Sequence, residues 1–168
     1  MSAHADLAER IEAARAAAAR VPDPELPFLT IADLGVLHAV EAGDDGRVTV
    51  AILPTYSGCP AMGVIALEIE AEIAKAGFPD ARVVVANAPA WTTDRMSASA
   101  REKLLEAGIA PPERRAEKRA LFAAPRDIAC PRCGSHDVLR VSEFGSTACK
   151  SLWRCGACRE PFEQFKCV

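Results

Sequence analysis

Four cysteines near the carboxyl end of the chain have the types and the spacing of ligands to one metal ion. Cys130 and Cys133 form one C-x-x-C pair, and Cys155 and Cys158 form a second. Two residues between thiolates let a tight turn direct both sulfurs at one ion, and two such turns complete a tetrahedral four-thiolate site. The spacing predicts a structural zinc ion, because closed four-cysteine sites mostly hold zinc. A rubredoxin-like iron or an iron–sulfur cluster is the alternative for the same thiolates.

Two further cysteines, Cys149 and Cys167, lie in the same region but outside both pairs. They are either ordinary buried thiols, which is the default for a lone cysteine, or extra thiols that hold a second metal or cluster transiently. His136 follows Cys133 by three residues, and with four thiolates available we expect it to be a surface residue rather than a ligand.

The seventh cysteine, Cys59, stands alone in the stretch "YSGCPAMGVI". Pro60 is suited to the first position of a helix, so Cys59 is predicted at or near the N-cap. Free backbone N–H groups and the helix dipole stabilise a thiolate there, which predicts a low-pKa, partly exposed thiol. Such a thiol is a candidate metal ligand or nucleophile. The alternative is a packed residue.

A second candidate lies in the loop "DPELP", where Asp23 and Glu25 are held between prolines. Such rigidity favours a preorganised ligand set, although the same residues could be a solvated loop or a cap. Asp33 is expected to cap a turn, and His38 to lie in a strand. The chain has no G-x-S-x-G, P-loop, Rossmann glycine or H-E-x-x-H motif, so we do not expect it to be catalytic by itself.

The elements that must position these residues follow from the apolar pattern. The sequence predicts an Ala-rich first helix that ends before Pro22, because three prolines in six residues cannot continue a helix. Next come a hairpin of "LGVLHAVEA" and "RVTVAIL" around "GDDG", a helix over about 60–75, and a buried Val-rich strand, "ARVVVANA". A last helix begins at Ser97 or Ser99 and ends at Gly108. The helix over 60–75 has an apolar stripe formed by Met62, Ile65, Ile69 and Ile73.

This order predicts an α+β protein with a small domain over residues 1–108 (helix-strand-strand-helix-strand-helix). A charged, proline-bounded linker covers 109–128, and a four-cysteine zinc ribbon covers 129–168, with strands in "HDVLRVSEF" and "KSLWRC". The linker contains four basic residues, and it is either a solvated linker or a docking patch for an acidic partner. The basic residues are Arg114, Arg115, Lys118 and Arg119.

Composition narrows the class of protein. Half of the residues are hydrophobic and 26% are charged, which is typical of a folded soluble domain. The net charge of -3 argues against binding to nucleic acid or to an anionic membrane. No apolar run could span a bilayer, and the charged amino-terminal helix is not a signal peptide. Seven cysteines without an export signal indicate a reducing compartment, so we expect a cytoplasmic protein.

Three stretches, "DPELPFLTIADLGVL", "LPTYSGCPAMGVI" and "PAWTTDRMS", resemble the small domain of SufT and of the cytosolic iron–sulfur targeting adaptors. The tail, "CPRCGS" followed by "SEFGSTACKSLWRCGACREPFEQFKC", resembles one family in particular, phenylacetate-degradation protein D (PaaD). The resemblance extends from about Val21 to Cys167.

The resemblance implies an accessory subunit of the ring-1,2-phenylacetyl-CoA epoxidase, produced with a di-iron oxygenase and an iron–sulfur flavin reductase. Its implied role is maturation: delivery or repair of iron or an iron–sulfur cluster in a partner subunit. Cys59 would be the reactive thiol, with Asp23 and Glu25 close to it. The alternative is a zinc-ribbon adaptor that holds oxygenase and reductase together without handling iron. A homodimer that pairs through the sheets of the small domains is a further expectation.

Overall fold

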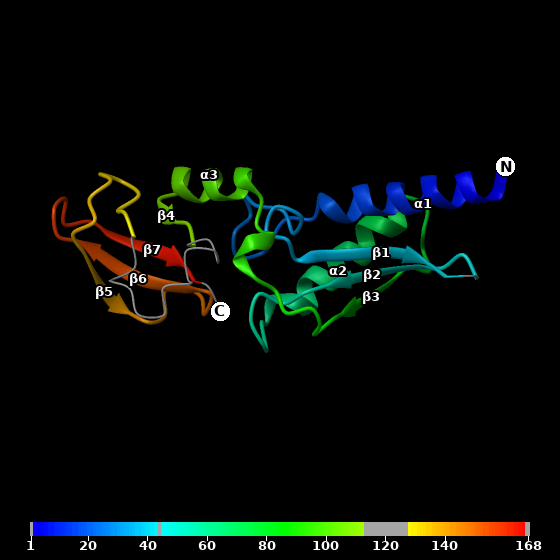
Figure 1. The fold of residues 1–168 in the computed structure, drawn as a ribbon. Coiled ribbons are helices and arrows are strands. Elements are labelled where there is room, and N and C mark those ends of the chain that lie inside the picture. Colours follow the sequence, from blue (N-terminus) through cyan, green and yellow to red (C-terminus); the bar gives the residue numbers. More distant parts are fainter. Residues whose placement is uncertain (1, 44, 113–127, 167–168) are drawn as a thin grey trace. The chain divides into compact units, whose positions relative to one another are not determined.

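The computed structural model describes residues 2–43, 45–112 and 128–166, which divide into two compact units, Met1–Trp91 and Thr92–Val168. The first unit contains helix α1, strands β1 and β2, helix α2 and strand β3 (Figure 1). Their bounds are Ser2–Ala19, Leu37–Ala42, Val48–Ile52, Ala61–Lys75 and Arg82–Val85. The second unit contains the short helix η1, helix α3 and strands β4 to β7. Their bounds are Thr93–Arg95, Ala98–Glu106, Ile109–Ala110, Val138–Ser142, Lys150–Cys155 and Pro161–Phe165.

The first unit is built on a three-stranded sheet in the order β1-β2-β3. β1 and β2 form the predicted antiparallel hairpin, and Gly46 takes the positive φ of 75° that its tight turn requires. β3 pairs in parallel with β2, so α2 is the crossover between them. α1 contacts both β1 and α2, and α2 contacts β3, which forms a helical layer beside the sheet. The predicted order of these five elements is confirmed.

The core lies between the sheet and this helical layer. Alternate residues of β2 (Val48, Val50 and Ile52) are buried, as expected for a strand with one covered face. The predicted stripe of α2 is also buried; its members are Met62, Ile65, Ile69 and Ile73.

The Val-rich strand is less buried than its composition predicts. In β3, Val84 is 37% exposed and Val85 is 47% exposed. The prediction of a buried strand is wrong because β3 lies at the edge of the sheet, where it has one neighbouring strand instead of two.

Ser97, one of the two predicted starts, is the N-cap of helix α3, and its Oγ accepts a hydrogen bond from the backbone N–H of Ala100 at 2.9 Å. The sequence predicts a first domain that ends at residue 108, whereas the compact units divide after Trp91 and leave α3 in the second unit. α3 contacts β4, which pairs with β7, and the Arg101 guanidinium donates to the carbonyl oxygens of Thr93 and Pro112 within the same unit.

The second unit has a four-stranded sheet in the order β4-β7-β6-β5. β5 and β6 form the predicted ribbon hairpin, and β7 adds a third antiparallel strand. β4 pairs in parallel with β7, so residues at the start of the predicted linker belong to this sheet. The four basic linker residues lie outside the described residues. The core of this unit is formed by Ala110, Ile128, Cys130, Trp153, Cys155 and Phe162.

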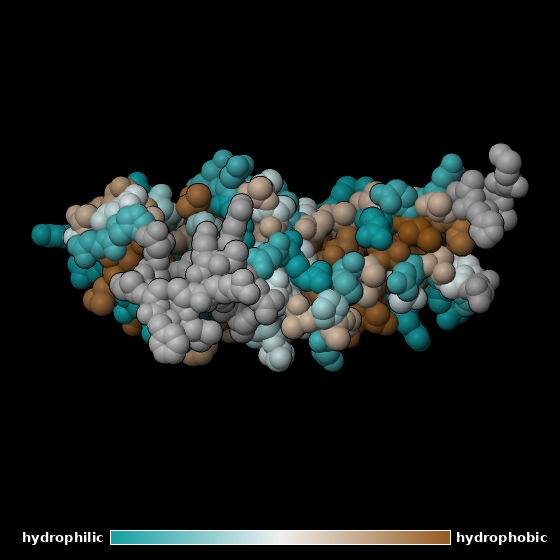
Figure 2. Space-filling model, in the orientation of Figure 1, coloured by the Kyte–Doolittle hydropathy of each residue, from teal (hydrophilic) through white to brown (hydrophobic). Residues whose placement is uncertain are grey.

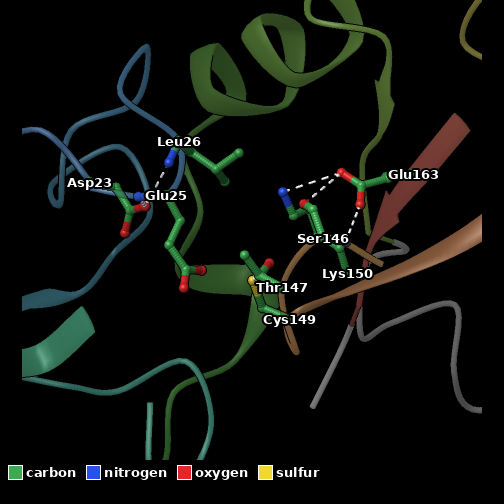
Figure 3. Close-up of polar contacts among 8 residues, drawn as sticks. All are labelled: Asp23, Glu25, Leu26, Ser146, Thr147, Cys149, Lys150 and Glu163. Atoms are coloured by element: carbon green, nitrogen blue, oxygen red, sulfur yellow. Dashed lines mark hydrogen bonds and ion pairs between the residues drawn. The ribbon is translucent and has the colours of Figure 1, made fainter. Parts of the chain in front are cut away.

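A buried ion pair holds the loop before β6 against β7. The Lys150 side chain is 5% exposed, and its Nζ lies 3.2 Å from Oε2 of Glu163, whose side chain is 21% exposed (Figure 3). The Glu163 carboxylate also accepts hydrogen bonds from the backbone N–H and the hydroxyl of Ser146. Burial by itself raises the pKa of Glu163, but the bonds from Ser146 and the charge of Lys150 outweigh it and keep the pKa below its usual value.

Replacing Glu163 with glutamine is expected to destabilise the second unit, because it leaves the Lys150 ammonium buried without a counter-ion. We expect the free energy of unfolding to fall by roughly 3 kcal/mol, measured by urea denaturation of zinc-loaded protein. Glu160→Gln removes an exposed ion pair with Arg132 and serves as the control, with an expected change below about 1 kcal/mol. Equal effects of the two substitutions would show that burial does not strengthen the Lys150 pair.

Candidate metal and thiol sites

The four cysteines predicted to bind zinc converge on one point. Their Sγ atoms all lie within 4.8 Å of one another. The Cys130 and Cys158 sulfurs are 3.7 Å apart, and the Cys133 and Cys155 sulfurs are 3.6 Å apart. A tetrahedral zinc ion with Zn–S bonds of about 2.3 Å would place its sulfurs about 3.8 Å apart. The donor set and its spacing therefore fit a closed zinc site.

Two tight turns bring these sulfurs together. In the first turn, the N–H of Gly134 donates to the carbonyl oxygen of Cys130 at 2.8 Å, and Gly134 takes a φ of 73°. In the second, the N–H of Cys158 donates to the Cys155 sulfur at 3.4 Å. This hydrogen bond is the main reason why the pKa of Cys155 falls to about 7. This N–H therefore favours the thiolate form of Cys155, which is the form that binds zinc.

Cys149 and His136 do not enlarge this site in the part of the chain that the structure describes. Cys149 is only 4% exposed, and its sulfur forms a hydrogen bond with Thr147 Oγ1 at 3.0 Å. His136 is not among the converging residues. Cys149 is therefore a packed thiol in this structure. Cys167 lies outside the described residues.

Cys59 lies one residue before the N-cap of α2, which agrees with its predicted position at or near the N-cap. Pro60 is the N-cap, and Gly58 takes the φ of 81° that turns the chain from strand to helix. The Cys59 side chain is half-buried. The Ala61 backbone N–H and the Tyr56 side chain hydrogen-bond the thiol and lower its pKa. Tyr56 was not predicted as part of the site, although its place in "TYSGCP" is a usable signal.

The prediction of a low-pKa thiol at Cys59 is wrong. Burial raises its pKa, and the negative charges of Glu25 and Asp23 raise it further, so the net shift is upward. The hydrogen bonds from the Ala61 N–H and the Tyr56 side chain do not compensate for burial and for the two carboxylates. The surroundings of Cys59 in this structure therefore disfavour the thiolate form.

Asp23 and Glu25 have different local roles. Asp23 is 8% exposed, and its Oδ1 accepts hydrogen bonds of 2.9 Å from the backbone N–H groups of Glu25 and Leu26 (Figure 3). Asp23 therefore fixes the loop, as a cap does. Glu25 has the larger electrostatic effect of the two on Cys59. Asp33 also caps a turn, through reciprocal hydrogen bonds with Thr30.

The fold thus brings the Asp23–Glu25 loop within electrostatic range of Cys59, although more than thirty residues separate them in sequence. Among the described residues, however, only the four ribbon cysteines bring three or more potential ligand atoms to metal-binding separations. Cys59 with Asp23 and Glu25 is therefore a thiol under the influence of two carboxylates. It is not a set of ligands already at metal-binding separations.

The hydropathy of the surface and of the helices bears on the prediction from composition. Hydrophilic and hydrophobic residues are interspersed over the face shown in Figure 2. None of the helices within the described ranges has the length and the apolar character needed to cross a membrane.

Comparison with known proteins identifies both parts of the chain. Residues 11–87 match the family model of an iron–sulfur cluster assembly protein, and residues 114–166 match that of the PaaD zinc beta ribbon domain. A solved Bacillus anthracis structure, described as a domain of unknown function (DUF59), is 27% identical with a TM-score of 0.52. The match covers 58% of this chain and 92% of the Bacillus anthracis chain.

Two curated relatives carry the comparison further. A protein of Porphyromonas gingivalis described as "Fe-S protein maturation auxiliary factor" is 34% identical over 53% of this chain and 82% of its own length. An Escherichia coli protein described as one component of a "Putative 1,2-phenylacetyl-CoA epoxidase" is 47% identical over 89% of this chain and 88% of its own length. With an iron–sulfur assembly domain followed by this particular zinc ribbon, and with such identity over nearly its whole length, the chain belongs to the PaaD family.

Proposed function

We propose that this protein is an accessory subunit of a phenylacetyl-CoA epoxidase that delivers or repairs iron, or an iron–sulfur cluster, in a partner subunit. The observation that carries the proposal is the half-buried Cys59 thiol beside the Glu25 and Asp23 carboxylates, within the domain that matches iron–sulfur assembly proteins. The partners are a di-iron oxygenase and an iron–sulfur flavin reductase. The protein is cytoplasmic and is not catalytic alone.

The chemistry of the Cys59 site suits a carrier. One soft thiolate with one or two hard carboxylates holds iron less firmly than four thiolates, which permits exchange with a recipient. The raised pKa of Cys59 makes metal binding depend on pH, because the thiol must lose its proton when a metal binds. The Asp23 and Glu25 carboxylates disfavour the thiolate when no metal is bound, but they would attract an iron cation. The affinity of the site for iron should therefore rise with pH below the pKa of the thiol.

A second candidate function is an adaptor that docks oxygenase and reductase without handling iron. One observation favours it: in the described residues only the ribbon cysteines converge at ligand distances. The two functions differ in their metal content. We would purify the protein without oxygen, supply iron and sulfide, and measure zinc, iron and sulfide together with the absorption spectrum. Zinc plus bound iron supports the carrier, whereas zinc alone, with co-purification at a fixed ratio to oxygenase and reductase, supports the adaptor.

The charge effect on Cys59 can be tested without any metal. Glu25→Gln removes the carboxylate with the larger electrostatic effect on Cys59, so the pKa of Cys59 should fall and alkylation by iodoacetamide at pH 7.5 should become severalfold faster. The rate at Cys59 is followed by peptide mapping over a pH series in zinc-loaded protein. Glu70→Gln, at an exposed position of α2, is the matched control and should leave the profile unchanged. An unchanged profile for Glu25→Gln would contradict the electrostatic coupling.

A further inference from the structure

The face of the first sheet that points away from its buried core presents two cross-strand rows. The pairing register aligns Ala39 with Ala51 and Ala51 with Val84, which forms an apolar row. It also aligns Glu41 with Thr49 and Thr49 with Arg82, which forms a row with opposite charges at its two ends. Aligned residues of adjacent strands project to the same side, so all six side chains share one face.

This face is distinct from the one that builds the core. Val40 and Val50, which alternate with these residues along β1 and β2, are buried. Glu41, Arg82 and Val84 are exposed, and the small central residues are half-buried. Neither Glu41 nor Arg82 forms an ion pair with another described residue of the chain. The outer face therefore has a flat centre of small residues and two longer, oppositely charged side chains at its edges.

We propose that this face is a homodimer interface, in which two copies pack sheet to sheet about a two-fold axis parallel to the strands. That axis places β1 of one copy over β3 of the other and leaves β2 over β2. Glu41 then faces Arg82 of the partner subunit, and the same contact occurs twice because a two-fold interface is self-complementary. The apolar row meets its counterpart at the same level along the strands.

The dimensions of the face fit this arrangement. Sheets that pack through larger side chains lie about 10 Å apart, and two faces with small central residues can approach more closely than that. Alanine and threonine at the centre allow close approach, while Glu41 and Arg82 are long enough to meet at the rim. Three short strands form a smaller area than the roughly 800 Å² per partner of a standard interface, so the dimer should be weak and should dissociate on dilution. Because its ion pairs are at the rim, added salt should weaken it.

This inference goes beyond the proposed function and does not depend on it, because no metal or other epoxidase component takes part. The test uses zinc-loaded full-length protein in sedimentation equilibrium from about 5 to 500 μM at low salt. We expect a monomer–dimer equilibrium in the wild type. Glu41→Arg and Arg82→Glu should each raise the dissociation constant roughly tenfold or more, because each places like charges together at two symmetric contacts. The double charge reversal should restore dimerisation to within severalfold of the wild type.

Glu70→Arg and Arg20→Glu are the matched controls, because they change the same charges at exposed positions of the helical layer, on α2 and at the end of α1, away from the six-residue face. Circular dichroism and zinc content confirm that each variant is folded. A monomer at every concentration would overturn the proposal. So would a dimer that is insensitive to the Glu41 and Arg82 substitutions, or one that the double reversal fails to restore.

Discussion

Cys133→Ser is expected to release the metal and to unfold the ribbon. Cys133 is one of the four converging thiols and is exposed, so its replacement removes a ligand without opening the apolar core. Loss of outer-shell partners alone can cost zinc sites 10–100-fold in affinity, and we expect a reduction of at least about a hundredfold here. Zinc binding contributes on the order of 10 kcal/mol to the folding of small four-ligand modules, so the sheet β4-β7-β6-β5 should lose its protection.

The measurements are zinc per chain by mass spectrometry and hydrogen exchange across β5, β6 and β7. Cys149→Ser is a demanding control, because that thiol is buried whereas Cys133 is exposed. If packing decided the outcome, the Cys149 variant would be the more damaged of the two. If metal ligation decides it, the Cys149 variant keeps one zinc per chain and the Cys133 variant does not. Retention of tightly bound zinc by Cys133→Ser would contradict a four-thiolate site.

Cys59→Ala is expected to abolish iron binding outside the ribbon and to leave the zinc in place. The substitution removes the soft donor of the proposed site, and the Asp23 and Glu25 carboxylates by themselves should hold iron only weakly. After anaerobic loading, iron should fall to the background level of a buffer control, with zinc at one per chain. Transfer of iron to the apo form of the epoxidase oxygenase should fall to the same background.

The control for Cys59→Ala is again Cys149→Ser, which keeps Cys59 and should keep both iron loading and transfer. Cys59→Ser tests the nature of the donor, since a hydroxyl of the same shape replaces the thiol. It should resemble the alanine variant if a thiolate is required. Full loading of the oxygenase by Cys59→Ala would exclude Cys59 as the working residue and would leave the adaptor as the better description.

Where neighbours in sequence decide a structure, the prediction from sequence alone is accurate. The stripe of Ile65, Ile69 and Ile73 predicts the buried face of α2, because side chains three and four residues apart share one side of a helix. The turn residues "GDDG" predict the β1–β2 hairpin for a similar local reason. The two C-x-x-C pairs predict the converging thiols, because each turn is local and a single ion can join the two pairs.

Three features could not be predicted from sequence. The exposure of β3 depends on its place at the edge of the sheet, which its valines do not specify. The parallel pairing of β4 with β7 joins residues that are far apart in the chain. Because of this pairing, the second unit includes α3 and β4 as well as the predicted ribbon. The pKa of Cys59 depends on burial and on carboxylates from a distant loop, so the local helix end predicted the opposite direction.

The sequence by itself therefore determined the order of the elements in the first unit, the four converging cysteines of the ribbon and the resemblance to the PaaD family. These properties depend on spacing and on residue type. Only the tertiary structure decided the direction in which the pKa of Cys59 shifts, the loop-fixing role of Asp23, and the apolar row and the charged row on the outer sheet face. Each of these depends on desolvation, on through-space charge or on strand register, which arise when distant segments pack together.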